Sequence, residues 1–266
     1  MIARTAAVVL RVSPYSSTSH VVTWLTRDQG KVGTLVKGAC RPKSPFLGQY
    51  DLFYTCELLY YSRERNSLHI AKSCYPVKIR AELRTDWRAF AYASYISGLM
   101  LLISFPGGHQ EEVFDLAQAV LDRLCSKGAE AQVLFWFEQR LAALLGIGPR
   151  WLKCAACDSP FSRSATTLFS AAGGGLLCED CGRDLPPRAV MPVSPDVRAI
   201  LSRWQQAQGP RVSAATRCSN RQLLVIRRIL GIFLQYHLDL TPTSRMTALD
   251  MASGAGRFCQ EVNKNG

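Results

Sequence analysis

The sequence predicts an α+β protein in which a small N-terminal β-barrel precedes a mainly helical part that carries an inserted zinc ribbon. Three observations predict this class. Short runs of β-branched and aromatic residues fill the first 80 residues. Apolar residues then recur at helical spacing, and two Cys-x-x-Cys pairs interrupt the helical pattern. We expect a barrel domain over residues 1–80, a helical domain over 81–266 and the ribbon over 151–188.

Five strands are expected in the N-terminal part, separated by clusters of turn-forming residues. Their expected ranges are 5–12, 20–26, 31–37, 52–61 and 68–73. A basic loop follows the third strand, and its prolines keep it out of regular structure. Five short strands in so short a segment predict an OB-fold, the five-stranded barrel that commonly binds nucleic-acid strands.

Helices are expected from residue 81 onward, over 86–104, 110–126, 129–145, 195–208 and 222–237. Thr85 or Asp86 can cap the first helix, and Ser219 can cap the last. Pro195 suits the first position of the fourth helix. Residues 89–108 carry no charge, but serines and tyrosines interrupt them. A buried helix is therefore expected there and not a membrane span.

Positive charge is concentrated at the N-terminal end of the chain. The protein holds 32 Lys and Arg against 20 Asp and Glu, a net charge of +12. Residues 1–80 contain 12 basic and four acidic residues, whereas 81–153 contain seven and eight. A basic surface on one domain indicates a polyanionic ligand, most often nucleic acid. The alternative is a basic face that only aids solubility.

An OB-type interface needs cations for phosphates and aromatic rings for bases. The aromatic candidates are Tyr15, Trp24, Phe46, Tyr50, Phe53, Tyr54, Tyr60 and Tyr61. About half of these must face the core because strand side chains alternate, so the basic loop after Lys37 is the stronger candidate. The candidate cations are Arg27, Lys31, Lys37, Arg41, Lys43, Arg63 and Arg65. A second basic cluster, which suits either a DNA or partner contact or an ordinary solvated helix face, is Arg217, Arg221, Arg227 and Arg228.

Two cysteine pairs predict one structural zinc ion. Cys154 and Cys157, and Cys178 and Cys181, each have a two-residue gap, and twenty residues separate the pairs. Two such turns supply the four thiolates of a tetrahedral zinc site, which leaves no open position for water. A redox pair or scattered reduced thiols are the alternatives. The other cysteines are expected to be small buried side chains of a reduced cytosolic protein: Cys40, Cys56, Cys74, Cys125, Cys218 and Cys259.

The sequence does not favour catalysis. Its four histidines are far apart and match no nucleophile or metal motif. Two other classes remain open. A zinc-containing regulator of transcription would need a base-reading helix beside the cysteines, where prolines break the segment 183–191. A zinc-dependent nucleic-acid hydrolase would need an open metal position. The apolar run 6–10 is too short for a signal peptide, so a cytoplasmic location is expected.

Four segments together are similar to the bacterial RecO recombinational repair proteins. They are VVTWLTRDQG at 21–30, KGACRPKS at 37–44, the block from Cys154 to Cys181 with its glycine triplet, and Ser244-Arg245. Cys40 stands where the family often has arginine, and no acidic residue lies between Tyr15 and His20.

The resemblance implies an OB-fold joined to a helical domain with a zinc ribbon. It implies a non-catalytic, nucleoid-associated protein that binds single- and double-stranded DNA and anneals complementary strands. With RecR, such proteins help RecA replace single-strand-binding protein on gapped DNA. The resemblance also implies that the helical domain recognises the acidic C-terminal tail of that protein.

Overall fold

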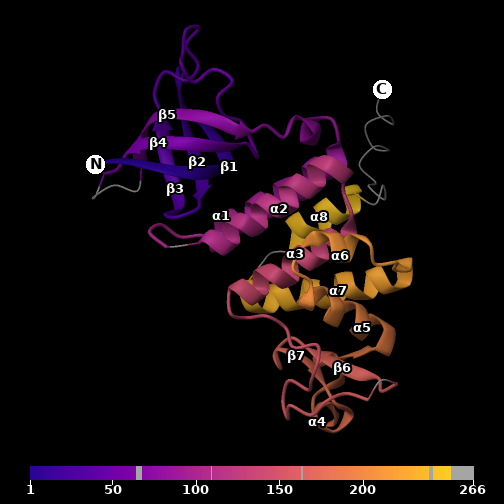
Figure 1. The fold of residues 1–266 in the computed structure, drawn as a ribbon. Helices are drawn as coiled ribbons and strands as arrows, with labels where there is room; N and C mark the ends of the chain where they lie inside the picture. Colours follow the sequence, from indigo (N-terminus) through magenta and orange to yellow (C-terminus); the bar gives the residue numbers. More distant parts are fainter. Residues whose placement is uncertain (64–67, 109, 163, 240–241, 253–266) are drawn as a thin grey trace, which may run out of the picture. The chain divides into compact units, whose positions relative to one another are not determined.

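The computed structural model describes residues 1–63, 68–108, 110–162, 164–239 and 242–252. Contacts divide the chain into two compact units, Met1–Gly128 and Ala129–Gly266. The first unit holds the barrel and two helices, and the second holds the remaining elements (Figure 1). The boundaries expected at residues 80, 151 and 188 stay predictions. Residues 253–266, which include Cys259, lie outside the described residues, as do Arg65 and His109.

Five strands close into a barrel in the order β1-β2-β3-β5-β4, which confirms the predicted barrel. All neighbouring strands are antiparallel except β3 and β5, which are parallel. The strands are β1 (Ile2–Ser16), β2 (Ser19–Thr26), β3 (Gly30–Val36), β4 (Thr55–Tyr61) and β5 (Leu68–Lys78).

The barrel core is built by alternation along the strands. Val22 and Trp24 of β2 and Val32 of β3 point inward and are almost fully buried. The indole Nε1 of Trp24 donates to the Thr34 hydroxyl at 2.8 Å, so its polar atom is satisfied inside the barrel. Phe46, from the loop after β3, packs against the same core.

Two strands are longer than predicted because irregular pairing accommodates their prolines. Residues 13–17 were expected to form a turn, yet β1 continues through Pro14 to Ser16, with a register shift beside the proline. Strand β5 was expected to end at Ser73 and continues through Pro76 to Lys78, again beside a shift in register. Proline is tolerated in a strand at such bulges and at edges.

Three helical segments complete the first unit: η1 (Ala81–Arg84), α1 (Trp87–Ile103) and α2 (Glu111–Lys127). The predicted cap of α1 is confirmed, because the Asp86 carboxylate accepts from the backbone N–H groups of Arg88 and Ala89. Within the described part of the chain, no helix is long and apolar enough to cross a membrane.

Several contacts join the barrel to these helices, including one made by Arg80 and another made by the turn between β2 and β3. Arg80, at the end of β5, is 3% exposed and donates to Thr55 of β4 at 3.0 Å and to Asp122 of α2 at 2.6 Å. At the other contact, the turn between β2 and β3 meets the loop between α1 and α2. There Lys31 N–H donates to Phe105 O at 3.1 Å. Gly30 has φ +62°, and any Cβ atom on it would overlap the Phe105 carbonyl oxygen.

The second unit packs helices around a core that includes Phe137, Leu201 and Phe233. The helices are α3 (Ala131–Leu144), α4 (Glu179–Arg183), α5 (Pro195–Gln206), α6 (Pro210–Ala214), α7 (Asn220–Leu238) and α8 (Pro242–Ala252). Helices α4, α6 and α8 were not predicted. The helix expected over 195–208 left Pro210 outside regular structure as a helix stop, but proline is also favoured at the first position of a helix, and α6 begins there.

A three-stranded sheet lies between α3 and α5 in the sequence, in the order β7-β6-β8. Its strands are β6 (Thr167–Ser170), β7 (Gly175–Leu177) and β8 (Met191–Val193). The predicted hairpin is present, and β8 is an additional strand. The last glycine of the triplet, Gly175, is required for steric reasons, because a Cβ atom at this position would overlap the backbone of Arg150. Arg150 exchanges backbone hydrogen bonds with Gly174 and Leu176 at 3.0 and 2.9 Å.

Candidate nucleic-acid interface and metal centre

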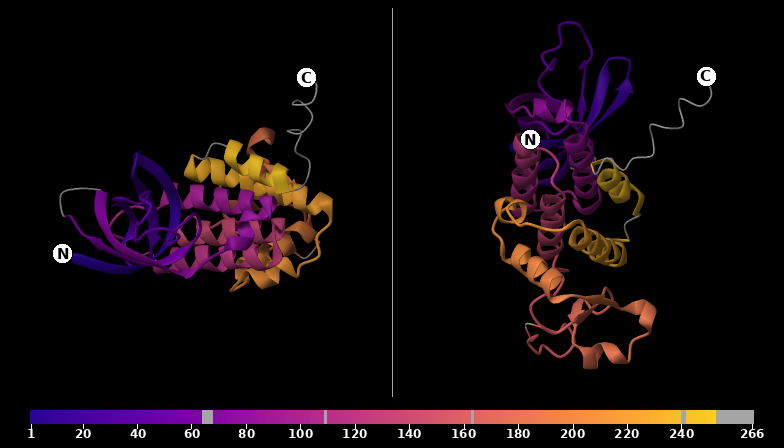
Figure 2. Two further views of the ribbon diagram at one scale, coloured as in Figure 1. Left: turned by 90° about the horizontal axis from the view of Figure 1, so that it is seen from above. Right: turned by 90° about the vertical axis from the view of Figure 1, so that its right-hand side faces the viewer.

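The loop after β3 is anchored at one end of the barrel. Its Gly38 N–H donates to the Ser19 hydroxyl at 3.2 Å, and its Cys40 N–H donates to Thr18 O at 3.1 Å. Both acceptors lie at the turn between β1 and β2, so the two segments project from the same end (Figure 2). Two backbone N–H groups of the loop therefore hold it against this turn.

Three of the predicted cations are exposed on this loop. Lys37, Arg41 and Lys43 are all exposed, and we call them the loop cations. Two consecutive turns shape the segment that carries them, because Arg41 N–H donates to Gly38 O at 3.1 Å and Ser44 N–H donates to Arg41 O at 2.9 Å. The predicted rim of Lys37, Arg41 and Lys43 is thus compatible with the loop geometry.

The other predicted cations lie elsewhere. Arg27 and Lys31 flank the turn between β2 and β3, at the opposite end of β3 from Lys37. The Lys31 ammonium donates to Leu101 O at 2.9 Å, in the last turn of α1, where it neutralises the carbonyl end of the helix. Arg27 lies 3.5 Å from the Asp115 carboxylate. Arg63 is exposed just after β4, and Arg65 lies outside the described residues.

Most of the candidate aromatic rings belong to the core. Trp24, Phe46, Phe53, Tyr54 and Tyr60 are buried, and Tyr50 is half-buried. Tyr15 and Tyr61 remain, with 62% and 44% of their surface exposed. Tyr75 on β5 is 57% exposed as well. The sequence reasoning missed it because the strand was expected to end two residues earlier.

The four arginines of the second basic cluster differ in their surroundings, because one of them forms an ion pair. Arg227 lies 2.7 Å from Asp250 of α8, whereas Arg217, Arg221 and Arg228 are exposed. The helix also exposes apolar side chains that share a face with two of these arginines. We call this face the α7 stripe: Arg221, Leu224, Arg228, Ile232 and Tyr236. Leu224 and Tyr236 are more than 60% exposed on this face.

A groove opens at the start of the α7 stripe. It has a volume of about 530 Å³ and lies where β8, the start of α5 and the start of α7 meet. Arg221 and Val225 line it from α7, and Pro192, Thr166 and Val197 provide much of the rest. Asp196 also lines the groove and accepts from the Gln222 amide at 2.7 Å. The groove therefore combines the exposed cation of Arg221 with a mixed lining, in which Pro192, Val197 and Val225 are apolar and the remaining residues are polar.

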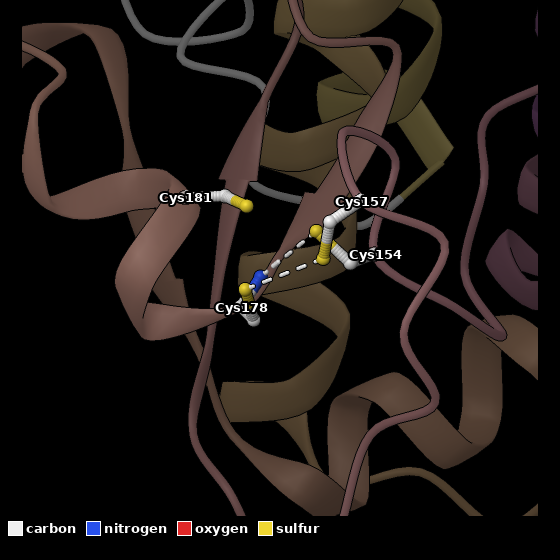
Figure 3. Close-up of side chains that lie close together, drawn as sticks. All are labelled: Cys154, Cys157, Cys178 and Cys181. Carbon is white, nitrogen blue, oxygen red and sulfur yellow. Dashed lines mark hydrogen bonds between the residues drawn. The ribbon is translucent and has the colours of Figure 1, made fainter.

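The four predicted metal ligands converge on one point. Their sulfur atoms all lie within 4.8 Å of one another, and Figure 3 shows the side chains directed toward a common centre, with Cys181 reaching in from α4. Around a tetrahedral zinc, sulfur atoms are separated by about 3.8 Å. The Cys157 and Cys178 sulfurs are 3.9 Å apart, and no pair of the four sulfurs exceeds 4.8 Å, so the cluster is of the size that one zinc ion needs.

The backbone around Cys154 favours a thiolate at this residue, whereas hydrogen bonds with the neighbouring Cys178 and Cys157 raise the pKa of Cys181 to about 12. Burial raises the pKa of Cys154, but hydrogen bonds from the backbone of Cys157, Cys178 and Ala156 outweigh it and lower the pKa to about 6. The Cys178 N–H, for example, donates to the Cys154 sulfur at 3.4 Å. A cluster of four sulfur ligands is typical of a structural metal site and not of a hydrolytic one.

Known proteins resemble this chain along most of its length. The family model described as recombination protein O N terminal matches residues 1–80, and the one described as recombination protein O C terminal matches residues 84–246. Proteins named DNA repair protein RecO are 30% identical to the chain in Moorella thermoacetica and Desulforudis audaxviator. These matches cover 90% and 91% of this chain and 87% and 94% of the relatives.

A third relative of the same name, from Rhodopirellula baltica, is 31% identical over 179 residues, which span 66% of this chain and 65% of that protein. The two family models together account for both the barrel and the helical part with its four cysteines. The chain therefore belongs to the RecO family of bacterial DNA repair and recombination proteins.

Proposed function

We propose that this chain is a recombination mediator that acts without catalysis. It binds single- and double-stranded DNA and anneals complementary strands. With RecR it promotes the loading of RecA onto DNA coated by single-strand-binding protein. One observation carries the proposal: the loop cations Lys37, Arg41 and Lys43 are exposed on an anchored loop at one end of a five-stranded barrel. Membership of a family of DNA repair proteins supports it.

The strand pairing supports a path for one DNA strand across β2 and β3. Val21 lies opposite Leu35, and Thr23 lies opposite Gly33, and all four are partly exposed. Gly33 also pairs with Leu68 at the start of β5. A strand that leaves the loop cations can therefore follow an uncharged face toward the exposed Arg63 at the other end, with Tyr15 and Tyr61 available for base stacking.

Annealing follows from charge neutralisation. Two DNA strands repel each other through their phosphates, and cations that bind both lower this repulsion. Binding of this kind releases counterions and weakens as salt rises. Annealing breaks no covalent bond in DNA, which agrees with the lack of catalytic motifs in the sequence.

The test is to replace Lys37, Arg41 and Lys43 together by alanine. Each phosphate contact to single-stranded DNA contributes about 0.7 to the slope of log affinity against log salt. The triple variant should therefore bind more weakly, with a slope about 2 smaller, and should anneal strands coated with single-strand-binding protein more slowly, with or without RecR. A matched control replaces three exposed cations of the chain outside the barrel: Lys127, Arg188 and Arg203.

The control variant loses the same net charge, so it should keep the slope of the unmodified protein if the loop cations make local contacts. An unchanged slope in the loop variant, or an equal change in both variants, would reject the assignment of the loop cations to DNA.

We further propose that the helical part receives the acidic, apolar C-terminal tail of single-strand-binding protein on the α7 stripe and in the adjoining groove. The chemistry supports this placement. Arg221 and Arg228 offer charge to the acidic residues of the tail. Apolar surface comes from Leu224 and Ile232 on the α7 stripe and from the apolar residues of the groove. RecR remains a proposed partner without an assigned surface.

The four-cysteine cluster is proposed to hold one zinc ion with a structural role. The ion would fasten the segment around Cys154 to the start of α4 and so complete the small sheet. Its place in the second unit, away from the barrel strands in sequence, supports a role in stability and not in DNA contact.

A further inference from the structure

Cys40 differs from the buried cysteine that was expected at this position. Its side chain is exposed, whereas Cys56 and Cys74 are buried in the barrel as expected. Cys40 lies on the anchored loop between Lys37 and Arg41, and Lys43 follows within three residues. The Cys40 thiol is therefore accessible to small molecules in solution.

A base lies within reach of this thiol. The Cys40 sulfur is 3.2 Å from Nε2 of His20, on the neighbouring strand β2. The other ring nitrogen of His20, Nδ1, is 2.7 Å from the hydroxyl oxygen of Tyr50. A nucleophile, a base within hydrogen-bond distance and a third group that orients the base are the arrangement that activates cysteine nucleophiles.

The third group is fixed by packing. The Tyr50 ring lies against Trp24, with ring centroids 6.2 Å apart, and its edge meets the His20 ring. Burial raises the pKa of Tyr50, so the phenol keeps its proton and remains neutral. Its oxygen can accept from the His20 Nδ1–H, which leaves the Nε2 lone pair directed at the Cys40 thiol.

We propose that Cys40 is a peroxide-reactive thiol that His20 activates and Tyr50 orients. His20 Nε2 takes the thiol proton. The thiolate attacks one oxygen of a hydroperoxide, so that an S–O bond forms and the O–O bond breaks. The leaving oxygen takes the proton from His20 and departs as water or an alcohol. The sulfur is oxidised to a sulfenic acid, and the peroxide is reduced.

The sulfenic acid can then condense with a low-molecular-weight thiol, forming a disulfide and releasing water. A thiol that carries carboxylate groups, such as glutathione, would place bulk and negative charge among the loop cations. This consequence for DNA binding rests on the proposed function, whereas the reactivity of Cys40 does not.

The reactivity is tested on the full chain loaded with zinc, so that the ligand thiols are protected. The protein is treated with hydrogen peroxide at pH 7, and sulfenic acids are trapped with dimedone and assigned to individual cysteines by mass spectrometry. The half-buried Cys218 is the internal reference. Cys40 should be trapped about tenfold faster than Cys218, as expected for an activated thiol.

Two variants separate activation from accessibility. His20→Gln should lower the rate at Cys40 toward that of Cys218, and Tyr50→Phe, which keeps the ring, should lower it in the same direction. Circular dichroism verifies that both variants fold. A Cys40 rate equal to that of Cys218, or one that His20→Gln leaves unchanged in folded protein, would overturn the proposal.

A separate measurement tests whether modification of Cys40 affects DNA binding. An oligonucleotide should slow the trapping of Cys40 if the loop contacts DNA, and treatment with peroxide and glutathione should weaken DNA binding by the unmodified protein but not by Cys40→Ser. Fast trapping that DNA does not slow would support the reactive thiol and count against the proposed DNA site.

Discussion

Replacing Arg245 by methionine is expected to destabilise the second unit strongly. The Arg245 guanidinium makes a two-pronged ion pair with Glu138, with Nε at 2.6 Å from Oε1 and Nη2 at 2.8 Å from Oε2. It also donates to Arg227 O at 3.0 Å. The two side chains of the pair are 8% and 0% exposed. The pair joins α8 to α3, and the carbonyl of Arg227 adds α7.

The magnitude follows from this burial. Removing one partner of a buried ion pair costs about 3–5 kcal/mol, because the remaining charge loses its partner and stays away from water. Methionine fills much of the space but donates no hydrogen bond to the Glu138 carboxylate. Replacing both residues of a buried ion pair by apolar ones often leaves the free energy of unfolding nearly unchanged. The double variant Glu138→Leu/Arg245→Met should therefore be clearly more stable than Arg245→Met alone.

The assay is urea unfolding of the zinc-loaded chain, followed by tryptophan fluorescence. Three of the five tryptophans, Trp136, Trp151 and Trp204, lie in this unit and are buried. A loss below about 1 kcal/mol in Arg245→Met, which is typical of an exposed pair, would refute the reasoning. So would a double variant that is less stable than the single one.

Two further predictions concern the second unit. Purified protein should contain one zinc ion per chain and release it on acidification, because protons compete with the metal for the thiolates. Cys157→Ser should lose zinc and stability but retain DNA affinity, and a parallel loss of DNA affinity would contradict a purely structural ion. Arg221→Glu/Arg228→Glu should weaken binding of a fluorescent acidic, apolar peptide by about tenfold, since opposite charges become like charges. Arg203→Glu, an exposed change on α5, is the control, and equal binding by all three proteins would exclude the α7 stripe.

The features that the sequence predicted correctly depend on neighbours along the chain. The strands around Trp24 follow from alternation, the start of α1 from a capping side chain at Asp86, and the four-cysteine cluster from two turns of fixed length. Local rules failed where prolines were interpreted as breaks, at Pro14 and Pro210, because a bulge or a helix start accommodates the same residue.

The features that could not be predicted depend on distant partners. Lys31 was grouped with the DNA-binding candidates, yet its ammonium binds the carbonyl of Leu101, seventy residues away. Arg245 appeared in the sequence only as part of a family resemblance, and its partner Glu138 is 107 residues away. No spacing rule connects such pairs, because only the tertiary fold brings them together.

The contact made by Arg80 has a consequence for how the barrel can be separated from the rest of the chain. The family models divide the sequence between residues 80 and 84, but the buried guanidinium at this boundary depends on Asp122 for its charge partner. A fragment cut at the family boundary would carry an arginine at its last position whose counter-ion has been removed. The family boundary and the boundary between compact units thus fall at different points of this chain, because the compact unit that contains the barrel extends through α2 to Gly128.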